Sequence, residues 1–150
     1  TFTEYYQDGV TPRKETPMQQ GKIDGTVKTY FRNGKIEAEK EYKQSVESGR
    51  ERRFDSKTGE QIFESHYIDG KKDGEEWEIF EDASTLRSRI IRHYRNGKLD
   101  GSYRVESTRD GKPYITIEGQ YTDGEKSGQW IEHNYDNNTQ TCTWHGEGGA

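Results

Sequence analysis

Apolar and polar side chains alternate along several short runs of the chain, and each run ends at a tyrosine. In the run that ends at Tyr42, Ile36 and Ala38 share the phase of the tyrosine, and glutamates stand between them. The runs that end at Tyr67 and Tyr121 alternate in the same phase. A period of two is typical of a β-strand that is buried on one side. The pattern therefore predicts short strands that bury their tyrosine side.

Turn signals separate these runs and recur at a nearly constant interval. The stretches MQQGKIDG, YIDGKKDG, YRNGKLDG and YTDGEKSG begin at residues 18, 67, 94 and 121. Including the second unit, the second glycines are 24, 25, 27 and 27 residues apart, at Gly25, Gly49, Gly74, Gly101 and Gly128. Seven residues before each of them stands Met18, Tyr42, Tyr67, Tyr94 or Tyr121. Asn-Gly and Asp-Gly steps are favoured in two-residue hairpin turns, which need positive φ.

A second family of turn signals lies between these motifs. Its members are RNGK at 32–35, KTGE at 57–60 and RDGK at 109–112, with EDAS at 81–84 and DNNT at 136–139 in the third and fifth units. Each unit therefore holds two turns and two short strands. We expect an all-β fold, an elongated antiparallel β-meander whose stacked hairpins form a twisted sheet or a shallow solenoid. A single hairpin is only marginally stable, so stacking against neighbours has to supply the stability.

The repeat divides the chain into a partial repeat or cap over 1–20, about five hairpin repeats over 21–145 and a flexible tail over 146–150. One segment, 75–94, allows two interpretations. Its apolar residues fit one side of a helix, whereas the repeat alignment favours two strands over 75–81 and 86–95.

The composition limits both the core and the function. Hydrophobic residues make up 26% of the chain and aromatic residues 12%, so we expect a thin core that is built largely from rings. The formal net charge of −5 argues against a nonspecific nucleic-acid binder, which needs a basic surface. The single cysteine, Cys142, excludes an internal disulfide framework. No apolar run approaches the length of a membrane-spanning helix.

The pattern Tyr-x-x-Gly-x-x-x-Gly-x-(Trp/Tyr), with Asn-Gly-Lys or Asp-Gly-Lys turns between copies, resembles the MORN repeat, and its bacterial variant in particular. The similarity rests on YIDGKKDGEEW, YRNGKLDGSY and YTDGEKSGQW and covers about 18–145. The second unit departs from the pattern, because Ser45 replaces the first glycine and no aromatic residue follows Gly49 directly. The resemblance implies stacked antiparallel hairpins and a non-catalytic scaffold that binds proteins or, in some members, membrane lipids. Bacterial variants are often exported or lipid-anchored, and some are described as antitoxins.

No catalytic motif is present. The chain has no Gly-x-Ser-x-Gly, no His-Glu-x-x-His and no phosphate-binding loop. Its histidines are scattered over different units, at His66, His93, His133 and His145. We therefore expect no enzyme activity, no metal and no cofactor.

Two features are candidates for binding. The first is a basic strand, in which Arg87, Arg89, His93 and Arg95 share the face opposite Tyr94. The guanidinium group of arginine can donate two hydrogen bonds to one carboxylate or phosphate, so this strand is a candidate site for an anion or a partner. The alternative is that these side chains pair with acids of EEWEIFED at 75–82, where each cross-strand pair contributes only about 0.2–1 kcal/mol.

The second feature is a series of rings. Trp77, Tyr103 and Trp130 follow the second glycine of successive units by two or three residues. In a stacked array they would form an aromatic ladder, and exposed rings of this kind anchor protein interfaces. The alternative is that they form the core of a sheet that is poor in leucine.

We therefore expect a non-catalytic β-repeat scaffold that binds another protein, most concretely an antitoxin or immunity protein that binds a toxin or another exported protein. The negative net charge of the chain favours a partner with a basic surface. One alternative is a membrane-surface adaptor, in which the segment from Arg87 to Lys98 meets anionic lipid head groups. A further alternative is a glycan-binding or hydrolytic module built on the aromatic ladder. Neither a nucleic acid nor a small molecule is an expected partner.

Overall fold

The computed structural model describes residues 1–81 and 87–146. The chain divides into two compact units, Thr1–Lys72 and Asp73–Ala150, and each is considered separately. The described residues form strands and turns and contain no helix. The expected all-β fold is confirmed.

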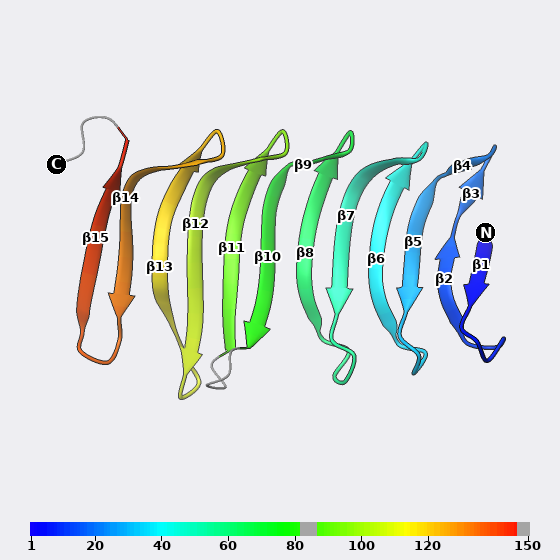
Figure 1. Ribbon diagram of the computed structural model, residues 1–150, viewed down its shortest axis with the longest axis horizontal. Coiled ribbons are helices and arrows are strands. Elements are labelled where there is room, and N and C mark those ends of the chain that lie inside the picture. Colours follow the sequence, from blue (N-terminus) through cyan, green and yellow to red (C-terminus); the bar gives the residue numbers. More distant parts are fainter. Residues whose placement is uncertain (82–86, 147–150) are drawn as a thin grey trace. The chain divides into compact units, whose positions relative to one another are not determined.

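In the first unit the strands are antiparallel neighbours in chain order, apart from one small separate hairpin (Figure 1). The order is β1 (Phe2–Tyr5), β2 (Pro12–Thr16), β5 (Gly25–Tyr30), β6 (Ile36–Lys43), β7 (Val46–Phe54) and β8 (Gln61–Ile68). β9 (Lys71–Lys72) pairs with β8, whereas β3 (Met18–Gln19) and β4 (Lys22–Ile23) pair with each other. Residues 1–20, expected as a partial repeat or cap, contain β1 to β3.

The second unit is an antiparallel meander in strict chain order. Its strands are β10 (Gly74–Glu81), β11 (Arg87–Arg95), β12 (Lys98–Arg109), β13 (Lys112–Thr122), β14 (Glu125–Asn134) and β15 (Thr139–His145). The described residues of the segment 75–94 are therefore strand on both sides of 82–86 and include no helix. The EDAS turn and most of the tail expected over 146–150 lie outside the described residues.

The turn after each repeat tyrosine has two residues in the left-handed region. The residue at the tyrosine position pairs with the residue five positions later, in the pairs Met18–Ile23, Tyr42–Glu47, Tyr67–Lys72, Tyr94–Leu99 and Tyr121–Lys126. Between Tyr94 and Leu99, for example, Asn96 and Gly97 have φ values of 54° and 84°. Two positive φ angles define the hairpin turn that the Asn-Gly and Asp-Gly steps predict. Ser45 has φ 67°, so the second repeat keeps this turn without the first glycine of the motif.

The second glycine of each repeat lies opposite the tyrosine of the next repeat. The pairs are Gly25–Tyr42 and Gly49–Tyr67 in the first unit, and Gly74–Tyr94 and Gly101–Tyr121 in the second. All of these glycines have positive φ, which is 110° at Gly101. The strand register shifts beside several of them, as in the pairing of β11 with β12 between Arg92 and Tyr94. The glycine therefore supplies a bulge conformation that residues with a side chain rarely adopt.

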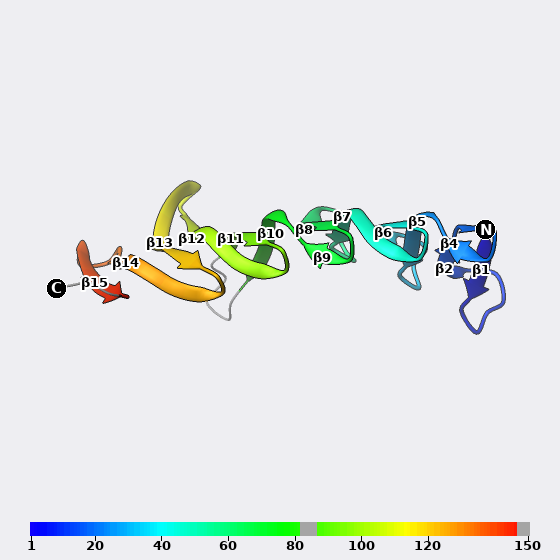
Figure 2. The same cartoon turned by 90° about the horizontal axis from the view of Figure 1, so that it is seen from above.

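Within each unit, turns of this kind follow one another along one edge of the sheet (Figure 2), and several are hydrogen-bonded to the turn of the preceding repeat. In the second unit, the Gly124 amide donates to the Leu99 carbonyl at 2.8 Å. The carboxylate that precedes the second glycine makes a further bond, because Asp100 Oδ2 accepts from the Asp123 amide at 3.2 Å. In the first unit, the Gly70 amide donates to the Glu47 carbonyl at 2.9 Å. These bonds give the Asp-Gly step of the repeat a structural role between neighbours.

The side of each sheet that carries the repeat tyrosines is here called the tyrosine face. In the first unit this face buries a charged group, Glu51, which is 6% exposed. Glu51 lies 2.7 Å from Arg53 Nη2 and 3.3 Å from Lys40 Nζ, and its carboxylate accepts a hydrogen bond from the Tyr67 hydroxyl at 3.1 Å. Although burial opposes ionisation, the hydrogen bond from Arg53 and the charge of Lys40 lower the pKa of the Glu51 carboxyl. Burial and the charge of Glu51 raise the pKa of Tyr67 to about 12.

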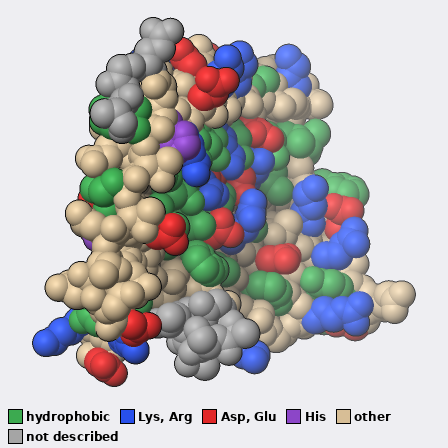
Figure 3. Space-filling view, turned by 60° about the vertical axis from the view of Figure 1, so that its left-hand side comes forward, with side chains coloured by type: hydrophobic (Ala, Val, Ile, Leu, Met, Phe, Trp, Pro, Cys, Tyr) green, Lys and Arg blue, Asp and Glu red, His purple; other side chains and the backbone are tan. Residues whose placement is uncertain are grey.

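The tyrosine face of the second unit begins with charges and continues with rings. Glu76 is fully buried and forms an ion pair with Arg92, whose Nη2 also lies 3.3 Å from Glu78. Two residues after the second glycine stand Val27 in the first repeat, Glu51 and Glu76 in the next two, and Tyr103 and Trp130 in the last two. On the face that Figure 3 presents, acidic and basic side chains interleave with hydrophobic ones. Because buried charges are stabilised only when they are paired, these ion pairs explain how a chain with few apolar residues fills a core.

Replacement of Gly101 by alanine tests the role of the second glycine. We expect Gly101→Ala to lower the free energy of unfolding by about 1–3 kcal/mol, because alanine rarely adopts a φ of 110°. The measurement is urea unfolding followed by circular dichroism. Lys98→Ala, at an exposed position on the same strand, is the control and should change stability by less than about 0.5 kcal/mol. Equal effects of the two substitutions would contradict the assignment.

The buried Glu51 cluster predicts a specific acid sensitivity. Because the folded-state pKa of Glu51 is lowered, its ionised form contributes stability above the ordinary value of 4.5, and that contribution is lost as the pH falls through the lowered value. We therefore expect Glu51→Gln to reduce the free energy of unfolding at pH 7, and the difference from the wild type to shrink at about pH 3. Urea titrations of both proteins at both pH values measure this, and a difference that does not change with pH would refute it.

Candidate functional site

The structure separates the three rings that the sequence suggests as one ladder. The ring centroids of Tyr103 and Trp130 are 5.3 Å apart, and Tyr121 lies 5.6 Å from the first and 5.2 Å from the second. Trp77 lies on the opposite face, where Arg89 Cζ is 4.5 Å from its ring centroid. Trp77 follows its glycine by three residues and the other two rings follow theirs by two, so strand alternation places it on the other side. Trp77 is therefore not part of the ring cluster.

The basic strand on β11 is largely compensated within the sheet. Its counterparts are Glu81 opposite Arg87, the Trp77 ring beneath Arg89, Glu75 at 3.6 Å from His93 and Asp100 at 3.1 Å from Arg95. Arg89 is less well satisfied, because its Nε atom is buried without a hydrogen-bond partner. The pairing with neighbouring acids, left open above, thus accounts for most of this strand.

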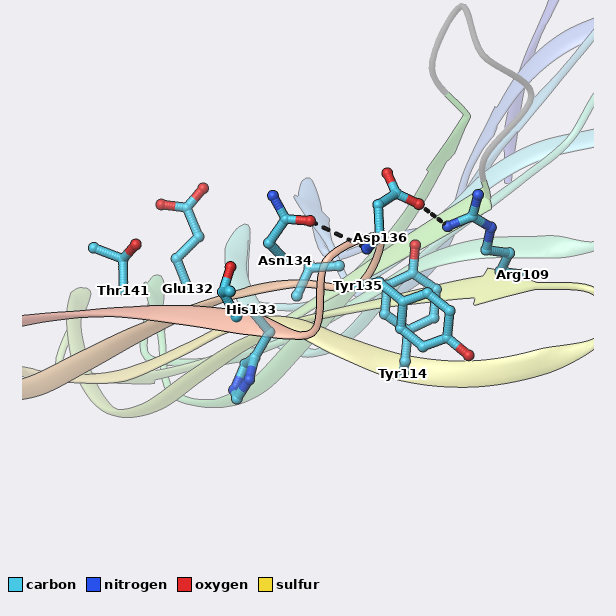
Figure 4. Close-up of a pocket in the computed structure, with 10 residues that line it drawn as sticks. Arg109, Tyr114, Glu132, His133, Asn134, Tyr135, Asp136 and Thr141 are labelled. Atoms are coloured by element: carbon cyan, nitrogen blue, oxygen red, sulfur yellow. Dashed lines mark hydrogen bonds and ion pairs between the residues drawn. The ribbon is translucent and has the colours of Figure 1, made fainter.

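Two adjoining hollows on the tyrosine face of the second unit form the candidate site. The first is a cavity of about 220 Å³ with Tyr103, Tyr121, Trp130 and His145 in its walls. The second has a volume of about 620 Å³ and lies nearer the turn between β14 and β15 (Figure 4). Both are lined by Glu132 and Thr141. We call the two together the ring groove.

The wall of the first hollow is rigidly built. Trp130 is 7% exposed and lies against Gly119, where an added Cβ would come within 2.2 Å of the indole ring. The indole Nε1 donates a hydrogen bond to the Gln120 carbonyl at 3.1 Å. On the other side, Lys126 Nζ lies 4.5 Å from the ring centroid. His145 occupies the tyrosine position opposite Gly128 and completes the cluster.

The second hollow is walled by a pair of stacked tyrosines. The rings of Tyr114 and Tyr135 have centroids 4.4 Å apart and planes inclined by 33°, and Figure 4 shows them overlapping. Arg109 forms an ion pair with Asp136 and places its guanidinium carbon 5.6 Å from the Tyr135 centroid. The Asp136 amide donates to Asn134 Oδ1 at 3.1 Å, which holds the turn. Tyr135 is 54% exposed, so its ring is available to a ligand.

Glu132 lies between the two hollows. Its side chain is exposed and points to the same side as that of Thr141, whereas His133 points to the other side of the strand (Figure 4). There His133 approaches Glu118 at 3.7 Å. Within residues 1–81 and 87–146, Glu132 makes no ion pair or side-chain hydrogen bond.

Sequence reasoning did not find Tyr114, Glu132 and Tyr135. Tyr114 lies on β13 and Tyr135 in the turn after β14, and a register shift in the pairing of β12 with β13, between Val105 and Glu106, lies close to Tyr114. Alternation counted along the chain does not predict the facing side chain across such a shift. The DNNT turn signal located the loop beside Tyr135 but gave no sign that its ring stacks on β13.

The groove offers rings, hydroxyls and a carboxylate. Within the described parts of the chain, no group of three or more His, Cys, Asp and Glu side chains is placed to hold a metal ion. Cys142 is exposed and lies on β15 opposite Ile131. The described residues also include no helix that is long and apolar enough to cross a membrane.

No protein-family model matches the chain, and no curated protein matches it.

Proposed function

We propose that this protein is a non-catalytic β-repeat scaffold that binds another protein through the ring groove. The observation that carries the proposal is the groove itself, an open hollow of about 620 Å³ beside a ring-walled cavity of about 220 Å³. Aromatic side chains that are held in place provide large contact areas at a low cost in conformational entropy, and they dominate protein interfaces.

The way the rings are held supports binding rather than a purely structural role. Trp130 is locked by Gly119 and by its hydrogen bond to Gln120, so the first hollow is pre-formed. Tyr135 is stacked on Tyr114 yet remains 54% exposed. Pre-formed walls reduce the ordering cost of association.

The repeat geometry supports assignment to the MORN type. The pairing of each tyrosine with the second glycine of the preceding repeat gives a physical reason for the spacing on which the resemblance to that family rests. The family resemblance extends the proposal to a concrete form, an antitoxin or immunity protein of a bacterium. The net charge of −5 favours a partner with a basic surface.

A membrane-surface role has less support. It relies on the basic strand on β11, and most of those charges have acidic or aromatic counterparts within the sheet. A compensated strand attracts anionic lipid more weakly than a free cluster of cations does.

Two exposed rings on opposite faces provide a matched test. Tyr135 lines the ring groove, whereas Trp144, 47% exposed, lies on the other face, because its β15 neighbour Thr143 lies in the groove. A photo-crosslinking amino acid at position 135, in cells that produce the protein, should yield one defined protein adduct, and position 144 should not. With the partner identified, we expect Tyr135→Ala to weaken its binding about tenfold or more and Trp144→Ala to have little effect.

The opposite pattern would refute the proposal. If position 144 crosslinks and position 135 does not, or if Tyr135→Ala leaves the dissociation constant unchanged, the ring groove is not the binding surface.

A further inference from the structure

An acidic group on the tyrosine face has a cation beside it in earlier repeats. Glu78 stands four residues after Gly74, and its carboxylate lies 3.3 Å from Arg92 Nη2 on the next strand. Arg92 also pairs with Glu76, the residue directly opposite it. In the first unit, Lys40 and Arg53 form ion pairs with Glu51.

Glu132 is the equivalent of Glu78 but has no such cation. It stands four residues after Gly128, and β15 pairs with β14 as β11 pairs with β10. Arg92 lies two residues before Tyr94, which is opposite Gly74. On β15 the residue opposite Gly128 is His145. The residue two positions before it, which corresponds to Arg92, is Thr143.

The remaining charges of the groove do not compensate Glu132. Asp136 and Arg109 pair with each other at the far end of the second hollow. Lys126 lies over Trp130 in the first hollow, 4.5 Å from the ring centroid. Glu132 therefore presents a free carboxylate between two groups of rings.

The protein also shows how rings and cations meet on this face. Lys40 Nζ lies 4.7 Å from the Tyr67 centroid, and Arg53 Cζ lies 4.2 Å from that of Phe63. A cation near a carboxylate and over a ring gains from both interactions. Arginine suits a site between rings and a carboxylate better than lysine does, because its planar guanidinium stacks on rings and donates two hydrogen bonds to one carboxylate.

We propose that the ring groove receives an arginine side chain of the protein partner, with Glu132 as its counter-ion and the tyrosine and tryptophan rings as its walls. This inference rests on the proposed function and specifies the chemistry of the partner's anchor. It agrees with the net charge of −5, which attracts basic surfaces.

Titration with a capped pentapeptide, acetyl-Gly-Gly-Arg-Gly-Gly-amide, tests the proposal by amide NMR spectroscopy. We expect saturable shifts at Glu132, Thr141 and Thr143. The same peptide with citrulline, which is neutral and nearly isosteric, should bind about fivefold to tenfold more weakly. Glu132→Gln should reduce affinity for the arginine peptide to the same extent. Glu125→Gln, which removes the same charge from an exposed position on the same strand, should leave it unchanged.

Several results would overturn the proposal. They are the absence of shifts in the groove, equal affinity for the arginine and citrulline peptides, and full affinity in Glu132→Gln. If cellotetraose shifts the amide signals of the ring groove and the arginine peptide does not, the ligand of the groove is a glycan and not an arginine side chain. If position 135 crosslinks a protein whose binding is insensitive to Glu132→Gln, this inference fails and the proposed function stands.

A second variant tests the same idea both with the arginine peptide and without any ligand. Thr143→Arg places an internal cation where β11 has Arg92, so it should pair with Glu132 and abolish the shifts caused by the arginine peptide. It should also raise the urea midpoint of unfolding in the wild-type background but not in Glu132→Gln. An equal change in both backgrounds would show that position 143 does not reach Glu132 and would overturn the structural premise.

Discussion

The contact on which the rest of the structure depends is the pairing of each repeat tyrosine with the bulge glycine of the preceding repeat. The glycine adopts a φ that side chains disfavour, and the turn after the tyrosine is hydrogen-bonded to the turn before it, as Gly124 is to Leu99. Each hairpin is too small to be stable alone. The period of the motif thus reflects a requirement between neighbours, and a repeat array is the natural consequence.

The same backbone position carries different chemistry in different repeats. Two residues after the second glycine, Glu51 and Glu76 are buried with cations from adjacent strands, whereas Tyr103 and Trp130 pack ring against ring. The backbone accommodates both the ion pairs and the ring cluster, because in each case the side chains on that face of the sheet contact partners from neighbouring strands. In the proposed function, the later repeats use the rings for binding, because they border open hollows rather than a closed charge network.

The fold was largely predictable and the site only in part. Turn chemistry and alternation located the hairpins, and repeat alignment correctly favoured strands on both sides of 82–86. The cluster of Tyr103 with Trp130 was also predictable, but the inclusion of Trp77 was wrong because one extra residue after the glycine reverses the face. Glu132 has no distinctive sequence signal, since the chain is rich in glutamate. Its significance comes from Thr143 on the neighbouring strand.

The sequence by itself determined the strands, the turns and the spacing of the repeat, because these follow from local backbone preferences and from a period of two. Only the tertiary structure decided which side chains meet across strands. The register shifts at several bulges and changes which side chains face one another. Tyr114 and Tyr135 stack for that reason. Whether a carboxylate has a cation beside it is likewise a property of neighbouring strands, as the contrast between Glu78 and Glu132 shows.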